Sequence, residues 1–367
     1  MKRRTFLGSV GAGVAGVLAG CAGIGGTPSD TGPQFDPETH ERASGTSLED
    51  LPPLSGNLTV YMGRGEGGLY AALLDHLETE RYPDLTLDVR RDSSAALANT
   101  IVEESSNGSS PADVFWSIDA GALGAVASRG YATPLPPAVT EPVPGQFVGT
   151  KRRWTGISGR ARAIPYNTDE LDESDVPTSI LAFPDDPTFQ NEMGWAPTYG
   201  AFQAFVTAMR YVHGESTTRE WLRGMLDAGV RQYSGEFLVT NAVAEGERTA
   251  GFANHYYALR LRNAKPDAPL GIAFTRDDAG ALVNASGALV VASSPRTDMA
   301  TNLIHHLLTV EVQEFLAQEA YEYPLVGGVS PPGGLPSIDE LNPPEFDLTN
   351  LADVQETLAM MRSVGVL

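Results

Sequence analysis

The chain has 367 residues, with 46 acidic and 25 basic side chains and a formal net charge of −21. It contains no stripe of basic residues that could meet phosphates, which argues against a nucleic-acid-binding protein. The acidic residues are spread over the whole chain, and the only lysines are Lys2, Lys151 and Lys265. This composition is typical of adaptation to high salt, where screening weakens the self-repulsion of a charged surface. A surface for cationic partners is the alternative.

The first 21 residues predict an export signal that ends at the only cysteine, Cys21. Lys2, Arg3 and Arg4 precede an apolar run that is too short to span a bilayer. The arginine pair resembles a twin-arginine signal, and Leu-Ala-Gly-Cys at 18–21 resembles a lipobox, so we expect a lipid anchor on Cys21. A plain secretory signal is the alternative. Without the signal, 46 acidic and 22 basic side chains leave a net charge of about −24, and no cysteine other than Cys21 remains.

Residues 22–56 lack apolar periodicity and predict a flexible acidic tether. After residue 57, strands and helices alternate. Strands are predicted at 58–62, 85–89 and 111–116, and helices at 68–79, from Ser93 or Ser94 to 105, and at 120–129. Three βα units in succession favour a parallel sheet with helices on its faces.

A second set of elements follows, so the chain is long enough for two lobes with separate cores. Strands are predicted at 161–166, 249–253 and 282–292, and helices at 301–308, 310–319 and 351–364. A further helix is predicted to begin at Thr198 as N-cap, because apolar residues at 202, 205, 206 and 209 keep helical spacing.

The segment Asn254-His255-Tyr256-Tyr257 is the most informative candidate for a binding site. Side chains that are adjacent on a regular strand point to opposite faces. Two neighbouring tyrosines therefore converge on one ligand only at a bend or in the first turn of a helix. This pair lies where a strand is predicted to end and a helix to begin, with Asn254 as a possible cap. Taken alone, such a pair more often packs in two different directions.

Seven segments occur in an informative order: LTVYMGR (58–64), ADVFW (112–116), ISGRARAIPYNT (157–168), WAPTYGAFQAF (195–205), NHYY (254–257), DAGALV (278–283) and YEYP (321–324). This order resembles that of the ferric-ion-binding proteins, the soluble receptors of iron-importing ABC transporters. The resemblance covers nearly everything after residue 57.

The resemblance implies an α/β fold of the periplasmic-binding-protein type (type II-like), with two hinged lobes and a ligand cleft between them. Residues 161–166 and a stretch near 270–275 would be the crossovers. The expected organisation is a signal (1–21), a tether (22–56), lobe 1 (57–160 and 271–325), lobe 2 (161–270) and a C-terminal segment with a helix (326–367). We expect a monomer without catalytic residues that carries Fe³⁺ to an ABC permease and ATPase. Its place would be the outer face of the cytoplasmic membrane of a halophilic archaeon.

The family's adjacent tyrosine ligands match Tyr256 and Tyr257. Fe³⁺ is a hard cation that prefers anionic oxygen, and a bound cation favours the ionised phenol. Many members place a His two residues after the position of Gly63, where this chain has Gly65. The neighbouring Glu66 could reach the metal instead.

Two further family positions also differ. Some members place a Glu ligand at the position of Ile118, and here the nearest acid is Asp119. Two asparagines that hold an anion in some members correspond to Gly235 and Glu236. The ligand set of His, Glu, two Tyr and phosphate therefore does not carry over intact.

Other members use a third tyrosine, and Tyr199 is the candidate, although a packed aromatic is the alternative. A carbonate or phosphate could complete the metal's shell, since free N–H groups at a helix start suit a small anion. The candidates for binding this anion are Arg64, Arg160, Gly200, Ala201 and Asn254. Salt bridges are the alternative for the two arginines. The roles of Tyr61, Tyr166 and His255 stay open.

Two other functions compete with iron binding. A two-lobed receptor could carry a polyamine, thiamine or a phosphonate. An exported hydrolase is the second, but the mature part has no Gly-x-Ser-x-Gly elbow, HExxH helix or paired-Cys site. Ser158-Gly159 and Ser286-Gly287 indicate turns. Metal analysis of the purified protein would distinguish iron binding from these other cargoes.

Overall fold

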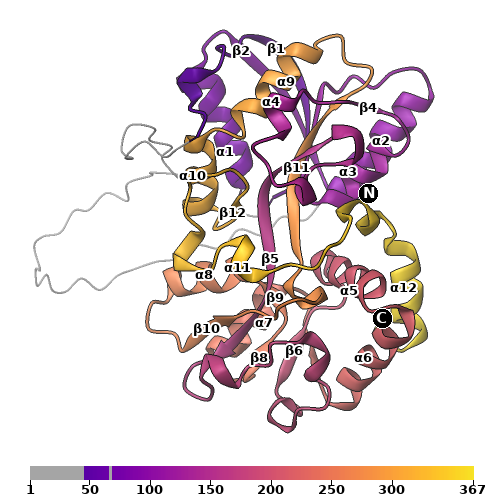
Figure 1. Ribbon diagram of the computed structural model, residues 1–367, viewed down its shortest axis with the longest axis vertical. Helices are drawn as coiled ribbons and strands as arrows, with labels where there is room; N and C mark the ends of the chain where they lie inside the picture. The colour runs from indigo at the N-terminus through magenta and orange to yellow at the C-terminus, as the bar shows by residue number, and fades with distance from the viewer. Residues whose placement is uncertain (1–44, 66–67) are drawn as a thin grey trace, which may run out of the picture. The chain divides into compact units, whose positions relative to one another are not determined.

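The computed structural model of the protein describes residues 45–65 and 68–367 (Figure 1). The expected signal with Cys21, most of the expected tether and Glu66 lie outside these residues. Leu48 and Leu54 are buried, so the folded part includes the last residues of the segment expected as a tether. In the described ranges, no helix is both long and apolar enough to cross a bilayer.

The first βα units form a parallel set, as their sequence predicts. β1 (Gly56–Gly63) pairs in parallel with β2 (Leu85–Asp92) and with β3 (Val114–Ser117). The helices of this set are α1 (Leu69–His76), α2 (Ser94–Ser106) and α3 (Ala120–Ala127). Ser93 is the N-cap of α2, and its hydroxyl accepts a hydrogen bond from the backbone N–H of Ala96 at 3.2 Å.

The 13-residue strand β5 (Thr155–Asn167) joins two groups of strands (Figure 1). Its first half pairs antiparallel with β11 (Val283–Val291) and β12 (Tyr323–Pro324). Its second half pairs antiparallel with β8 (Ala250–Gly251), β9 (Ala253–Asn254) and β10 (Leu270–Ala273). The short strand β4 (Ala132–Thr133) lies beside β11. The short strand β6 (Met193–Trp195) lies between β8 and β7 (Arg231–Gln232) and pairs with both.

The strand predicted at 161–166 is thus only the second half of a longer one. Ser158-Gly159 and Ser286-Gly287 lie inside β5 and β11, so the expectation of turns there is wrong. The glycines serve close packing instead: a Cβ added at Gly287 would lie 2.5 Å from the backbone oxygen of Thr155.

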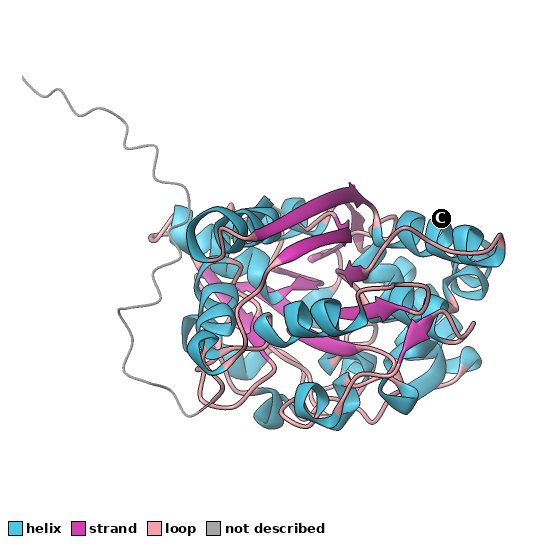
Figure 2. Ribbon diagram, turned by 90° about the horizontal axis from the view of Figure 1, so that it is seen from above, coloured by secondary structure: helices cyan, strands magenta, loops and turns pink. Residues whose placement is uncertain are grey.

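The remaining helices cover the strands on both sides (Figure 2). They are α4 (Pro137–Thr140), α5 (Gly200–Val212), α6 (Glu215–Asp227), α7 (Glu236–Ala244), α8 (His255–Ala264), α9 (Thr297–His306), α10 (Val310–Glu319), α11 (Ile338–Leu341) and α12 (Val354–Ser363). The helix predicted after Thr198 is α5, and its periodic apolar residues are buried. Its N-cap is Tyr199 rather than Thr198, because the backbone of Tyr199 is still extended.

The C-terminal segment contacts both groups of elements. Its 3₁₀ turn, Leu348–Ala352, packs on α3, where a Cβ on Gly121 would lie 2.8 Å from the backbone of Leu351. The helix α12 packs on α5. Arg210 of α5 is 2.6 Å from Glu356 of α12, so an ion pair adds to this contact. The C-terminal segment, with its helix α12, is therefore packed against both groups of elements.

Candidate functional site

Tyr256 and Tyr257 lie in the first turn of α8, directly after β9. Asn254 is the N-cap, with an extended backbone, and the helix begins at the next residue. Neighbouring side chains on a helix diverge by about 100° rather than by the ~180° of a strand. The two rings therefore approach each other, with centroids 4.5 Å apart. The predicted strand-to-helix position of the pair is confirmed.

Tyr199 joins this pair from the start of α5. Its hydroxyl oxygen lies 2.7 Å from that of Tyr257, and the two rings meet edge to face. Tyr256 and Tyr257 are buried, and Tyr199 is partly buried against them. The structure thus brings the three expected tyrosines into one cluster of phenol groups, called here the tyrosine cluster.

A buried ion pair that the sequence did not predict is linked to Tyr256 through Asn254. Arg162 Nη1 donates to Glu236 Oε1 at 2.5 Å and to Asn254 Oδ1 at 3.1 Å. Asn254 Nδ2 donates to the hydroxyl of Tyr256 at 3.1 Å. The backbone N–H of Asn254 donates to Glu236 Oε2 at 2.9 Å. Arg162, Asn254 and Glu236 are all buried. A chain of polar contacts therefore runs from this ion pair to the phenol of Tyr256.

Arg160 interacts electrostatically with Tyr256 and with several other acidic groups. Burial alone lowers the pKa of its guanidinium, but Tyr256, Glu322, Tyr70 and Asp119 outweigh burial and raise it. Tyr70 donates to Glu322 Oε2 at 2.6 Å, and burial together with this carboxylate raises the pKa of the Tyr70 phenol. Among the described residues, Arg160 Nε is buried without a hydrogen-bond partner. Arg160 is therefore a charged group close enough to Tyr256 to interact with its phenol.

Other residues expected at the site have different surroundings. Arg64 is exposed, and its backbone N–H donates to the Asp92 carbonyl at 2.8 Å. Asp119 caps α3, where its carboxylate accepts from the N–H of Ala122 at 2.8 Å. Burial raises the pKa of Asp119, while its backbone bond and Arg160 oppose that rise.

Gly200 and Ala201 are the first residues of α5. The N-cap side chain of Tyr199 makes no capping hydrogen bond, so it leaves the first N–H groups of the helix to other partners. A Cβ placed on Gly200 would meet no atom within 4 Å. This helix start therefore has room beside it.

Three residues whose roles the sequence left open make hydrogen bonds or packing contacts with other groups. The ring nitrogens of His255 lie 3.2 Å from the carbonyl oxygen of Ala161 and 2.6 Å from that of Tyr321. Burial lowers the pKa of His255 to about 4. The hydroxyl of Tyr61 donates to Glu104 at 3.0 Å. Tyr166 lies in the second half of β5, where its ring packs on Gly271.

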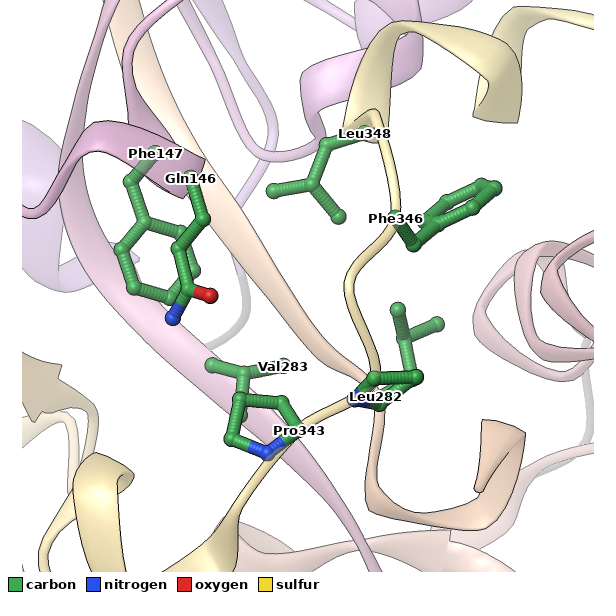
Figure 3. Close-up of a pocket in the computed structure, with 8 residues that line it drawn as sticks. Gln146, Phe147, Leu282, Val283, Pro343, Phe346 and Leu348 are labelled. Atoms are coloured by element: carbon green, nitrogen blue, oxygen red, sulfur yellow. The ribbon is translucent and has the colours of Figure 1, made fainter. Parts of the chain in front are cut away.

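A cavity in the structure lies away from the tyrosine cluster, between β11 and the C-terminal segment (Figure 3). Its lining consists of Gln146, Phe147, Leu282, Val283, Pro343, Pro344, Phe346 and Leu348. Within the described residues, no group of three or more His, Cys, Asp or Glu side chains is placed to hold a metal ion. The tyrosine cluster is therefore the candidate metal site among the described residues, because its phenol oxygens can ionise and bind a cation.

β5 joins two groups of strands, and polar side chains lie at the start of helices in one of these groups. This is the architecture of a two-lobed solute-binding protein. Residues 109–346 match the model of a family described as bacterial extracellular solute-binding protein. The chain is 31% identical to the major ferric iron-binding protein of Neisseria meningitidis serogroup B, over 87% of this chain and 96% of that protein. It is 30% identical to the Fe(3+)-binding periplasmic protein of Serratia marcescens, over 77% of this chain and 83% of that protein.

The crystal structure of iron-bound HitA from Pseudomonas aeruginosa superposes with a TM-score of 0.74 at 29% identity, over 84% of this chain and 99% of that one. The chain therefore belongs to the family of bacterial extracellular solute-binding proteins, among whose members are ferric iron-binding proteins. The expected two-lobed α/β fold and the resemblance to ferric-ion-binding proteins are both confirmed.

Proposed function

We propose that this protein binds Fe³⁺ between its lobes through the phenolate oxygens of Tyr256, Tyr257 and Tyr199 and delivers it to an ABC permease. The observation that carries this proposal is the 2.7 Å separation of the Tyr199 and Tyr257 oxygens. Tyr256, beside Tyr257 in the first turn of α8, adds a third phenol. Phenolate is the hard, anionic oxygen donor that a ferric ion prefers.

The charge of the site supports the same cargo. Three phenolates carry three negative charges and balance one ferric ion. Each phenol loses its proton when the cation binds, so binding releases protons and weakens in acid. A buried site strengthens the attraction between the cation and the phenolates, because little water is present to screen it. A divalent ion or a neutral solute would gain less from the same three groups.

A small anion such as carbonate or phosphate completes the metal's shell in this proposal. The start of α5 at Gly200 and Ala201 offers N–H groups, and Arg160 offers a positive charge with a buried, unpartnered Nε among the described residues. Glu66 remains the proposed fourth protein ligand, and Arg64 an outer contact of the anion. Asn254 is less suited to the anion, since both ends of its amide already have protein partners.

Delivery requires the protein to stay near the membrane. Solute-binding proteins of this family work with an ABC permease and an ATPase. The lipobox at Cys21 would anchor this chain on the outer face of the cytoplasmic membrane, with residues 22–44 as the tether. A monomer is sufficient for this role.

The test is metal analysis of the purified protein combined with a binding titration. Ferric ion, supplied as a weak chelate, should bind one per chain and produce a visible phenolate-to-iron charge-transfer band. Spermidine, thiamine and methylphosphonate serve as the alternative cargoes in parallel titrations. Tight binding of any of these, with no ferric colour, would contradict the proposal and favour a receptor for that solute.

A further inference from the structure

We infer that Arg162 and Glu236 form a positioning pair, which fixes the amide of Asn254 as a hydrogen-bond donor to the oxygen of Tyr256. The contacts are those from Arg162 to both partners and from Asn254 Nδ2 to Tyr256, at 3.1 Å for the last. The inference rests on the proposed function, because it assigns these residues a role in presenting Tyr256 to the cation.

The orientation of the Asn254 amide follows from the chemistry of its neighbour. A guanidinium only donates hydrogen bonds, so the amide atom 3.1 Å from Arg162 Nη1 has to be the oxygen, Oδ1. The opposite end of the planar amide is then the nitrogen, and it faces the hydroxyl of Tyr256. A flipped amide would place two donors against each other at Arg162. The arginine therefore dictates that Tyr256 meets a donor.

Glu236 holds the other two members of this group in place. One carboxylate oxygen accepts from Arg162, and the second accepts from the backbone N–H of Asn254 at 2.9 Å. Glu236 is also the first residue of α7, where the helix N-terminus favours a negative charge. Its two oxygens thus fix both the guanidinium and the end of β9 from which the tyrosines follow.

A donor at this position suits a phenol that binds a cation. When Tyr256 gives up its proton, the oxygen keeps accepting from Asn254 Nδ2, and the hydrogen bond gains strength because its acceptor is charged. An acceptor in the same place would repel the phenolate. A buried ion pair adds little to stability by itself, since the loss of solvation offsets the attraction of the charges. A role in positioning explains why Arg162 and Glu236 lie next to Asn254, which contacts Tyr256.

Three substitutions test this inference. Asn254→Asp keeps the shape but turns a carboxylate oxygen towards Tyr256. Glu236→Gln removes one of two acceptors, and Arg162→Lys keeps the charge but lacks a fork that reaches two partners. The control is Asp113→Asn, which weakens the ion pair between the buried Asp113 and the partly exposed Arg296, at 2.8 Å, on the other group of strands.

The readouts are ferric affinity by chelator competition, the position of the charge-transfer band, and urea unfolding of the iron-free protein. We expect the three variants to lose at least about tenfold in affinity, as for a charge-assisted hydrogen bond, and to shift the band. Asp113→Asn should lower stability while keeping the affinity and the band. If Asn254→Asp does not fold, the affinity and the band of Glu236→Gln and Arg162→Lys test the inference by the same criteria.

Folded variants with unchanged affinity and band would overturn the inference and leave the proposed function standing. A wild-type protein that takes up no ferric ion would overturn the proposed function, and this inference with it.

Discussion

The hydroxyl oxygens of Tyr199 and Tyr257 lie 2.7 Å apart, although 58 residues separate the two tyrosines along the chain. Each comes from the beginning of a helix, Tyr199 as the N-cap of α5 and Tyr257 in the first turn of α8. At this distance one phenol donates its proton to the other. In the proposed site, a cation that binds both oxygens displaces this proton and that of the second phenol.

Tyr199→Phe should therefore weaken ferric binding by at least about tenfold and shift the charge-transfer band, because a Phe ring offers no oxygen to the cation. The iron-free protein should lose about 1 kcal/mol of unfolding free energy with the lost hydrogen bond. Chelator competition and visible absorption measure the first two effects, and urea unfolding the third.

Tyr61→Phe is the matched control for Tyr199→Phe. The Tyr61 hydroxyl bonds to Glu104 at 3.0 Å and belongs to β1, outside the tyrosine cluster. Its loss should leave the ferric affinity and the band unchanged. Equal behaviour of the two variants would remove Tyr199 from the ligand set.

Salt should stabilise the fold. Without the signal, 46 acidic and 22 basic side chains leave a net charge of about −24, which produces strong self-repulsion when screening is weak. We expect the melting temperature to rise between about 0.1 M and about 2 M KCl, with much of the rise at the lower concentrations, where screening changes most. A melting temperature that stays constant over this range would contradict the adaptation to high salt.

Acid should destabilise the iron-free protein through His306. This ring is buried between the Tyr82 hydroxyl, at 3.0 Å, and the Asn302 carbonyl, at 2.8 Å. Burial lowers the pKa of His306 from its ordinary 6.5 to about 4. Between these two pH values the unfolded chain binds a proton that the folded protein does not, so stability falls as the pH falls.

His306→Gln should reduce the slope of unfolding free energy against pH by about 1.4 kcal/mol per pH unit in this window, the effect of one proton. Urea unfolding at a series of pH values gives the slope directly. His305→Gln, at the less buried neighbouring position, is the control and should change it less. An unchanged slope in His306→Gln would mean that this histidine takes up its proton in the folded state.

Cys21 should carry the membrane anchor. Cys21→Ser removes the thiol that a lipobox requires, so the variant should leave the membrane fraction or remain unprocessed. Fractionation of cells and the mass of the exported protein measure the two outcomes. A variant that is processed and bound to membranes like the wild type would exclude lipid attachment at Cys21.

The sequence predicted those parts of the fold that depend on local patterns. The α10 helix begins at Val310 and ends at Glu319, as its apolar spacing indicated. The strand-to-helix position of Tyr256 and Tyr257 was predicted because a strand was expected at 249–253, directly before them. The first half of β5 was missed because its glycines and serines suggested a turn, whereas in the structure they allow close packing between strands.

The missed part of the site depends on contacts between distant segments. Arg162 and Glu236 are 74 residues apart, and nothing in either local sequence indicates that they pair. Glu236 could be recognised only as a departure from the family pattern, without a partner that explains it. Such a pair becomes visible only when β5 and α7 are placed side by side.

The central claim is that Tyr256 and Tyr257 bind Fe³⁺ as phenolates, and it is tested most directly by the visible spectrum of the protein during ferric titration. We predict a charge-transfer band in the wild type and in Tyr61→Phe. The band should be shifted or bleached, with severely weakened binding, in both Tyr256→Phe and Tyr257→Phe. It should also fade on acidification as protons displace the metal. Native colour and native ferric affinity in both Tyr256→Phe and Tyr257→Phe would contradict the account and point to another cargo for this two-lobed fold.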